Sequence, residues 1–123
     1  MLTQKSKGTK RPRDGCTPQK NHELDALIIF LEQMTELHQI TTKTVIDVGA
    51  GVGHLSWELA KEGYSVVAIE GNERNARKCA DITAARPEIQ CVTKYINDET
   101  DLNVIQEPCI SVSIRTSYFY KPI

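Results

Sequence analysis

A chain of 123 residues with a formal net charge of −1 is long enough for one small domain and shows no charge bias toward a partner. Its 40% hydrophobic and 25% charged residues are typical of a globular protein. No apolar run could cross a bilayer, so we expect no membrane partner. Four widely spaced cysteines lack the Cys-x-x-Cys spacing of zinc sites, so we expect no metal. Cys79 and Cys91 lie in apolar stretches and are expected to be buried thiols of an intracellular protein, cytoplasmic or nuclear.

Residues 1–21 are polar and basic and lack apolar periodicity, which predicts a disordered arm. The basic cluster at 10–13 is expected to be solvated, with nuclear import or RNA contact as the alternatives. A helix follows, and we expect Asn21 to cap its start. Apolar residues at helical spacing form its inner stripe: Leu24, Leu27, Ile28, Leu31, Met34 and Leu37.

Strands and helices then alternate. We expect strands over 44–48, 65–69, 89–96 and 109–114, and helices over 54–62 and 73–86. The inner side of the last helix is expected to carry Ala76, Cys79, Ala80 and Thr83. This order predicts an α/β Rossmann-like three-layer sandwich with three or four parallel strands, truncated relative to a full sheet. The domain would span 22–114, and a short tail would occupy 115–123.

A glycine-rich turn joins the first strand to the next helix. Asp47 precedes Gly49, Gly51 and Gly53, which leave the backbone open to a ligand at the start of a helix. Glu70 follows Gly51 by about 20 residues, at the end of the next strand, where an acid can accept both hydrogen bonds of a ribose diol. Nicotinamide enzymes place their third glycine where this chain has His54, which disfavours that ligand.

The spacing of Asp47 and the three glycines, with Glu70 beyond them, resembles class I S-adenosylmethionine-dependent methyltransferases. The resemblance implies that S-adenosylmethionine is the cofactor and that Asp47 helps to orient its methionine amino group. It implies that the glycine turn approaches the amino-acid end of the cofactor and that Glu70 binds the ribose. It also implies that Asn72 lies beside the adenine and that Asp98 hydrogen-bonds the adenine amino group.

From Lys20 to about Asp81 the chain resembles the methyltransferase-like protein 25 group, whose relatives are labelled ribosomal-RNA adenine dimethylase domain-containing. The resemblance lies in Lys-Asn-His-Glu at 20–23, in the stretch 47–56, and in Ile-Glu at 69–70. Gln19, Val52 and His54 depart from the group's pattern. Enzymes that methylate nucleic-acid amino groups usually carry an Asn/Asp-Pro-Pro-Tyr/Phe motif. The chain has no Pro-Pro pair, so its residues do not support adenine methylation.

These patterns predict an S-adenosylmethionine-binding methyltransferase-type domain that is inactive as this truncated chain. The acceptor is left open among RNA, protein and small molecules, and so is the oligomeric state. No catalytic residue is assigned, since His22 and His38 are expected on the surface and His54 near the glycine turn. Two alternatives remain: a non-enzymatic Rossmann-like interaction module, and, less favoured, a nicotinamide-dependent oxidoreductase fragment.

Overall fold

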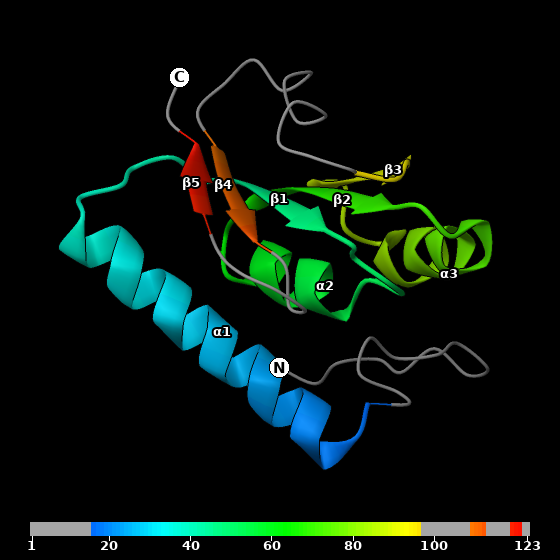
Figure 1. The fold of residues 1–123 in the computed structure, drawn as a ribbon, viewed down its shortest axis with the longest axis horizontal. Coiled ribbons are helices and arrows are strands. Elements are labelled where there is room, and N and C mark those ends of the chain that lie inside the picture. Colours follow the sequence, from blue (N-terminus) through cyan, green and yellow to red (C-terminus); the bar gives the residue numbers. More distant parts are fainter. Residues whose placement is uncertain (1–15, 97–108, 113–118, 122–123) are drawn as a thin grey trace.

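The part of the chain that the structure describes folds into three helices and a five-stranded sheet (Figure 1). The computed structural model describes residues 16–96, 109–112 and 119–121. In chain order the elements are α1 (Pro18–Leu37), β1 (Thr44–Val48), α2 (His54–Lys61), β2 (Ser65–Glu70), α3 (Glu73–Thr83), β3 (Ile89–Thr93), β4 (Cys109–Val112) and β5 (Phe119–Lys121). The four strands β1 to β4 run parallel, which confirms the predicted Rossmann-like α/β fold.

The strand order β3-β2-β1-β4-β5 places β1 at the point where the order of the chain reverses. Val45 of β1 is in register with Val66 of β2 on one side and with Ile110 of β4 on the other. In open parallel sheets, ligands bind outside the carboxyl ends of the strands at such a reversal. The fold therefore makes the turn after Val48 the candidate ligand site.

Helix α1 begins at Pro18, one turn before the expected Asn21. Its cap is Thr17, whose hydroxyl accepts a hydrogen bond from the backbone N–H of Lys20 at 3.1 Å. Pro18 suits the first helical position because it needs no N–H partner there and its φ is already helical. Residues 18–21, which the composition assigned to the arm, are thus the first turn of the helix, while 1–15 lie outside the described residues.

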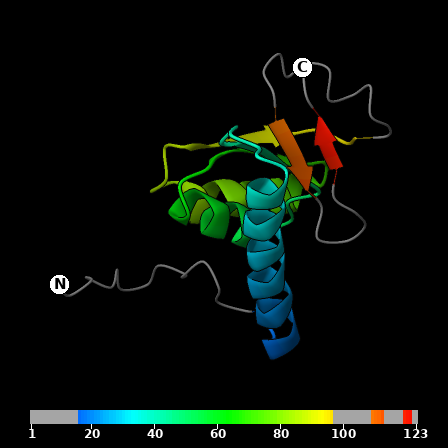
Figure 2. The same ribbon diagram turned by 90° about the vertical axis from the view of Figure 1, so that its left-hand side faces the viewer.

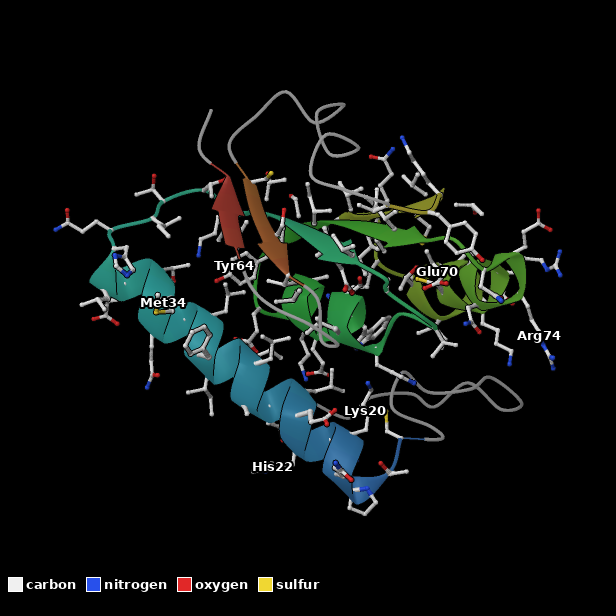
Figure 3. The ribbon with its side chains drawn as sticks, in the orientation of Figure 1. Lys20, His22, Met34, Tyr64, Glu70 and Arg74 are labelled. Atoms are coloured by element: carbon white, nitrogen blue, oxygen red, sulfur yellow. The ribbon has the colours of Figure 1, made fainter. Side chains whose placement is uncertain are left out.

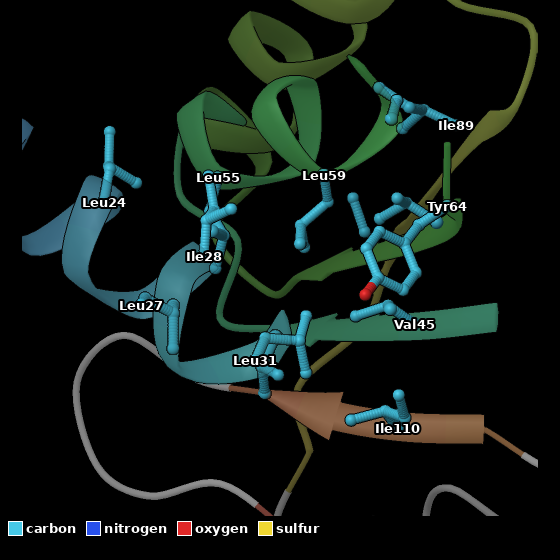
Figure 4. Packing of buried hydrophobic residues seen from close by; sticks show 14 of the residues in the cluster. Leu24, Leu27, Ile28, Leu31, Val45, Leu55, Leu59, Tyr64, Ile89 and Ile110 are labelled. Atoms are coloured by element: carbon cyan, nitrogen blue, oxygen red, sulfur yellow. The ribbon is translucent and has the colours of Figure 1, made fainter. Parts of the chain in front are cut away.

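The main core lies between the helices and one face of the sheet. Leu24, Leu27, Ile28 and Leu31 of α1 are buried there, and Figure 4 shows Leu31 close to Val45 and Ile110. Full burial of each such side chain contributes about 1.5–3 kcal/mol. The expected stripe ends early: Met34 is half-buried and Leu37 is 72% exposed, because α1 extends beyond the sheet at this end.

All three helices cover the same face of the sheet (Figure 2). The opposite face carries a smaller cluster formed by Ile46, Ile69 and Cys109. No helix within 16–96, 109–112 or 119–121 covers that face, so the described residues form two of the three expected layers.

Several element boundaries and orientations differ from the sequence expectations. Helix α3 ends at Thr83, whose hydroxyl donates a hydrogen bond to the carbonyl of Cys79 at 2.7 Å, and not at residue 86. Ala80 of this helix is exposed, whereas the sequence predicted that it faces inward. Strand β3 ends at Thr93 rather than at residue 96. Cys91 is exposed because β3 is the edge strand of the sheet.

The two strands nearest the C-terminus also differ. All four residues of β4 are buried, Ser111 included, because β4 lies between β1 and β5; residues 113 and 114 lie outside the described residues. Strand β5 falls in the segment expected to be a tail, and it pairs antiparallel with β4.

A cation–π contact joins α2 to the segment that follows α3. The guanidinium of Arg86 lies over the ring of Trp57, 4.8 Å from its centroid. Trp57 also donates its backbone N–H to the carbonyl of Gly53 at 3.0 Å, within the first turn of α2. The contact thereby fixes the approach to β3 against the helix that begins at the glycine turn.

Candidate functional site

The glycine turn is held against the end of β2. The backbone N–H groups of Gly49 and Ala50 both donate to the carbonyl of Ile69, at 2.9 and 3.0 Å. Gly49, Gly51 and Gly53 have φ values of +70°, +62° and +97°, which L side chains rarely adopt. The turn therefore needs glycine at these positions for its backbone conformation, whether or not a ligand is present.

The surroundings of the three glycines divide them into two kinds. A Cβ added to Gly49 or Gly51 would meet no atom within 4 Å, so this side of the turn is open. A Cβ added to Gly53 would lie 2.8 Å from the sulfur of Cys79 on α3. Gly53 is thus bare so that α3 can pack against the turn, whereas Gly49 and Gly51 leave space for a ligand.

Glu70 joins the glycine turn to the start of α3. Its Oε1 accepts the N–H of Gly51 at 2.7 Å, and its Oε2 accepts the N–H of Asn72 at 2.9 Å. Figure 3 shows Glu70 at the end of β2, beside α3. Each carboxylate oxygen has a second lone pair, so both can still accept a hydrogen bond from a diol. Glu70 thus holds the turn through its two backbone hydrogen bonds and can still accept hydrogen bonds from a ligand.

A pocket opens next to Glu70 at the carboxyl ends of β1, β2 and β3. Its lining is formed by Val48, Gly49, Ile69, Glu70, Gly71, Lys94, Tyr95 and Ile96. The Tyr95 ring packs on Gly71 so closely that any Cβ there would collide with it. The ring thus forms one wall of the pocket, and its side chain is 67% exposed.

Asp47 is buried beneath the turn, and its side chain is 1% exposed. The Ser56 hydroxyl donates to Oδ2 of Asp47 at 2.7 Å. The pKa of Asp47 is raised to about 7, chiefly because burial disfavours its charged form; the Ser56 hydrogen bond opposes this rise, and the negative charge of Glu70 adds to it. Asp47 therefore lies behind the turn and does not line the pocket.

Of the two residues expected at the adenine, the structure describes Asn72 but not Asp98. Asn72 caps α3, since its Oδ1 accepts the N–H of Asn75 at 3.0 Å, and its side chain is exposed outside the pocket lining. Asp98 lies outside the described residues. Sequence reasoning missed Lys94 and Tyr95, although their position directly after the third strand would place them at the same sheet edge.

No three His, Cys, Asp or Glu side chains in the described segments lie close enough together to hold a metal ion. None of the helices described is long and apolar enough to cross a membrane.

The parallel sheet, the open glycine turn and the acid after β2 define a Rossmann-like domain of the kind that binds nucleotide cofactors. Residues 19–108 match a family profile described as a methyltransferase domain. Because the match covers most of the chain, the protein belongs to this methyltransferase domain family. By this membership it is a class I methyltransferase-type domain, and S-adenosylmethionine is the usual methyl donor of such domains.

Three solved structures share the fold. Monomeric WbdD is 20% identical with a TM-score of 0.58, over 75% of this chain and 21% of that chain. The PH0226 protein from Pyrococcus horikoshii OT3 is 19% identical with a TM-score of 0.55, over 68% and 40%. A putative S-adenosyl-L-methionine-dependent methyltransferase from Methanococcus maripaludis is 20% identical with a TM-score of 0.52, over 89% and 68%.

The chain spans about a fifth of the length of the WbdD structure, and identities at this level show the fold alone. Among curated protein sequences, none matches the chain.

Proposed function

We propose that this domain binds S-adenosylmethionine at the carboxyl ends of β1, β2 and β3, as the donor half of a methyltransferase. The observation that carries the proposal is the position of Glu70. This carboxylate borders the pocket and contacts both the glycine turn and the start of α3. Two adjacent acceptor oxygens at the edge of an open glycine turn are what a ribose diol requires.

The residues present fit this cofactor, with Gly49 and Gly51 leaving room that a Cβ would fill. Glu70 would bind the ribose, and Gly49 and Gly51 would border the amino-acid end. The resemblance assigns the methionine amino group to Asp47, which lies buried behind the turn. Tyr95 offers an aromatic face beside Gly71 for the adenine, and the resemblance adds Asn72 and Asp98 at the same end.

Bound S-adenosylmethionine supplies a methyl group on an electrophilic sulfonium. The contribution of this chain is to bind and orient the donor, and positioning can supply much of the rate of such a transfer. The proposal covers the donor and not the acceptor, for which RNA, protein and small molecules are the classes to test.

Within the family we place the domain beside the methyltransferase-like protein 25 group, on the residues at 20–23 and 47–56. The free thiols of Cys79 and Cys91 support an intracellular location.

The test is a calorimetric titration with S-adenosylhomocysteine and, in parallel, with NAD. We expect binding of the first and none of the second. Glu70→Ala should weaken S-adenosylhomocysteine binding by roughly 1.5–3 kcal/mol, because it removes a charged acceptor. Glu36→Ala, which removes an exposed carboxylate on α1, is the matched control. Equal affinities for the two variants, or tight binding of NAD, would contradict the proposal.

A second candidate is a non-enzymatic Rossmann-like interaction module. The two backbone hydrogen bonds of Glu70 favour it, because they hold the turn without any ligand. This candidate predicts that Glu70→Ala lowers the free energy of unfolding while the wild-type chain binds neither ligand. Urea unfolding of the same variants, beside the titrations, separates the two candidates.

A further inference from the structure

Two free cysteines face each other between α3 and β3. The sulfur atoms of Cys79 and Cys91 lie 3.7 Å apart. Cys79 is 1% exposed, whereas Cys91 is exposed on the edge strand. The hydroxyl of Thr83 lies 3.4 Å from the Cys91 sulfur, so the Cys91 side chain is held against α3. A disulfide bond is about 2.05 Å long, and the two sulfurs would have to approach by about 1.7 Å.

We propose that Cys79 and Cys91 form a reversible intramolecular disulfide, and that this disulfide loosens the glycine turn and weakens cofactor binding. The first part depends only on the two cysteines. The effect on the cofactor rests on the proposed function.

The oxidant that we propose for this pair is a hydroperoxide, which can reach the exposed thiol of Cys91. The Cys91 thiolate attacks one peroxide oxygen, the O–O bond breaks, and Cys91 becomes a sulfenic acid as hydroxide leaves. The Cys79 sulfur then attacks the Cys91 sulfur, the S–O bond breaks, and the displaced hydroxide leaves as water with the Cys79 proton. In sum, two thiols and one hydrogen peroxide give one disulfide and two waters.

The order of these steps follows from the surroundings of the two thiols. Burial raises the pKa of Cys79, so this thiol stays protonated and is not the first to react. Cys91 is the accessible member and Cys79 is the resolving one. A low-molecular-weight thiol can reach the disulfide from the Cys91 side and reduce it.

The connection to the glycine turn runs through Cys79. The position of a Cβ on Gly53 would lie 2.8 Å from the Cys79 sulfur and 3.5 Å from the Cys79 Cα, so Cys79 packs directly on the bare Gly53. Gly53 is the last residue of the turn and precedes α2. When the sulfur becomes bonded to β3, its packing against Gly53 changes and the turn loses support. Close-packed interiors transmit such shifts because they contain little free space.

The disulfide itself is tested by peptide mass mapping after hydrogen peroxide treatment and alkylation. Trypsin leaves both cysteines on the peptide 79–94, because Pro87 follows Arg86. We expect this peptide to lose two hydrogens and to carry no alkyl group. Glutamyl endopeptidase cuts after Glu88 between the two cysteines, and it should leave two peptides joined by the disulfide. Cys91→Ser should abolish the product and Cys16→Ser should retain it. Two alkylated cysteines, or a link to another cysteine or chain, would overturn the proposal.

The coupling is tested by two readouts on reduced, oxidised and re-reduced protein. Amide exchange across 49–57 should rise on oxidation and return with dithiothreitol. The affinity for S-adenosylhomocysteine should be lost and restored in parallel, while Cys91→Ser should show neither change. A disulfide that leaves exchange unaltered overturns the coupling. If the reduced wild-type chain binds no S-adenosylhomocysteine, the proposed function fails, while the mass and exchange results still decide the redox proposal.

Discussion

Asp47 is a buried carboxyl group that accepts a hydrogen bond from the Ser56 hydroxyl. Burial raises its pKa from 3.8 to about 7, so the ionised form is disfavoured in the folded protein. Below about pH 4 the group is neutral in both the folded and unfolded chain. Between about pH 4 and pH 7 only the unfolded chain ionises, and this lowers the free energy of unfolding. Above about pH 7 the loss is complete.

Asp47→Asn should remove this pH dependence, because the amide keeps an acceptor for Ser56 and does not ionise. The gain in stability of the variant over wild type should grow from about pH 4 to about pH 7 and then stay constant. Urea unfolding at a series of pH values measures it. Asp81→Asn, on the exposed side of α3, is the control. Parallel pH profiles for wild type and Asp47→Asn would contradict the assignment.

The glycine turn is open on the side where Gly49 lies. Gly49 and Gly63 both have positive φ, +70° and +102°, and a Cβ on either would meet no atom within 4 Å. Gly49→Ala and Gly63→Ala should each cost about 1–2 kcal/mol of stability, because an L residue is strained there. Gly49 lines the pocket, so Gly49→Ala alone should weaken S-adenosylhomocysteine binding in calorimetry. A similar loss of affinity in Gly63→Ala would trace the effect to stability instead.

Helix α1 is part of the core. Leu24 is fully buried, while Ile29 on the same helix is 54% exposed. Leu24→Ala should cost about 2–5 kcal/mol, because it leaves a cavity in the main core. Ile29→Ala should change the free energy of unfolding by at most about 0.5 kcal/mol. Chemical denaturation followed by circular dichroism measures both, and equal costs would show that α1 does not pack as described.

The sequence predicted the centres of the elements better than their ends. Apolar spacing was sufficient for α1 and for the buried strands, because burial repeats along an element. The start of α1 depends on one side chain, Thr17, and on Pro18 after it, and both lie in a stretch whose composition resembles an arm. The end of α3 depends on the Thr83 hydroxyl, and periodicity carries no information about such a local hydrogen bond.

The fold class and the glycine turn with Glu70 were predictable from spacing along the chain. Strand β5 was not, because three residues carry no periodic signal and their pairing depends on the edge that β4 provides. The pocket wall at Tyr95 was not predicted either. Its contribution depends on the sheet bringing the end of β3 beside Gly71, which only the assembled fold shows.

The contact between Arg86 and Trp57 makes the fluorescence of Trp57 a probe of this region. Trp57 is the one tryptophan of the chain, and it lies in the first helical turn after the glycine turn. Its emission depends on the cation above its ring and on access of water, so a shift of α2 or of the segment holding Arg86 alters it. Arg86 lies between Cys79 and Cys91 in the chain. Unlabelled protein can therefore be followed by fluorescence in real time, during ligand titration and during oxidation alike.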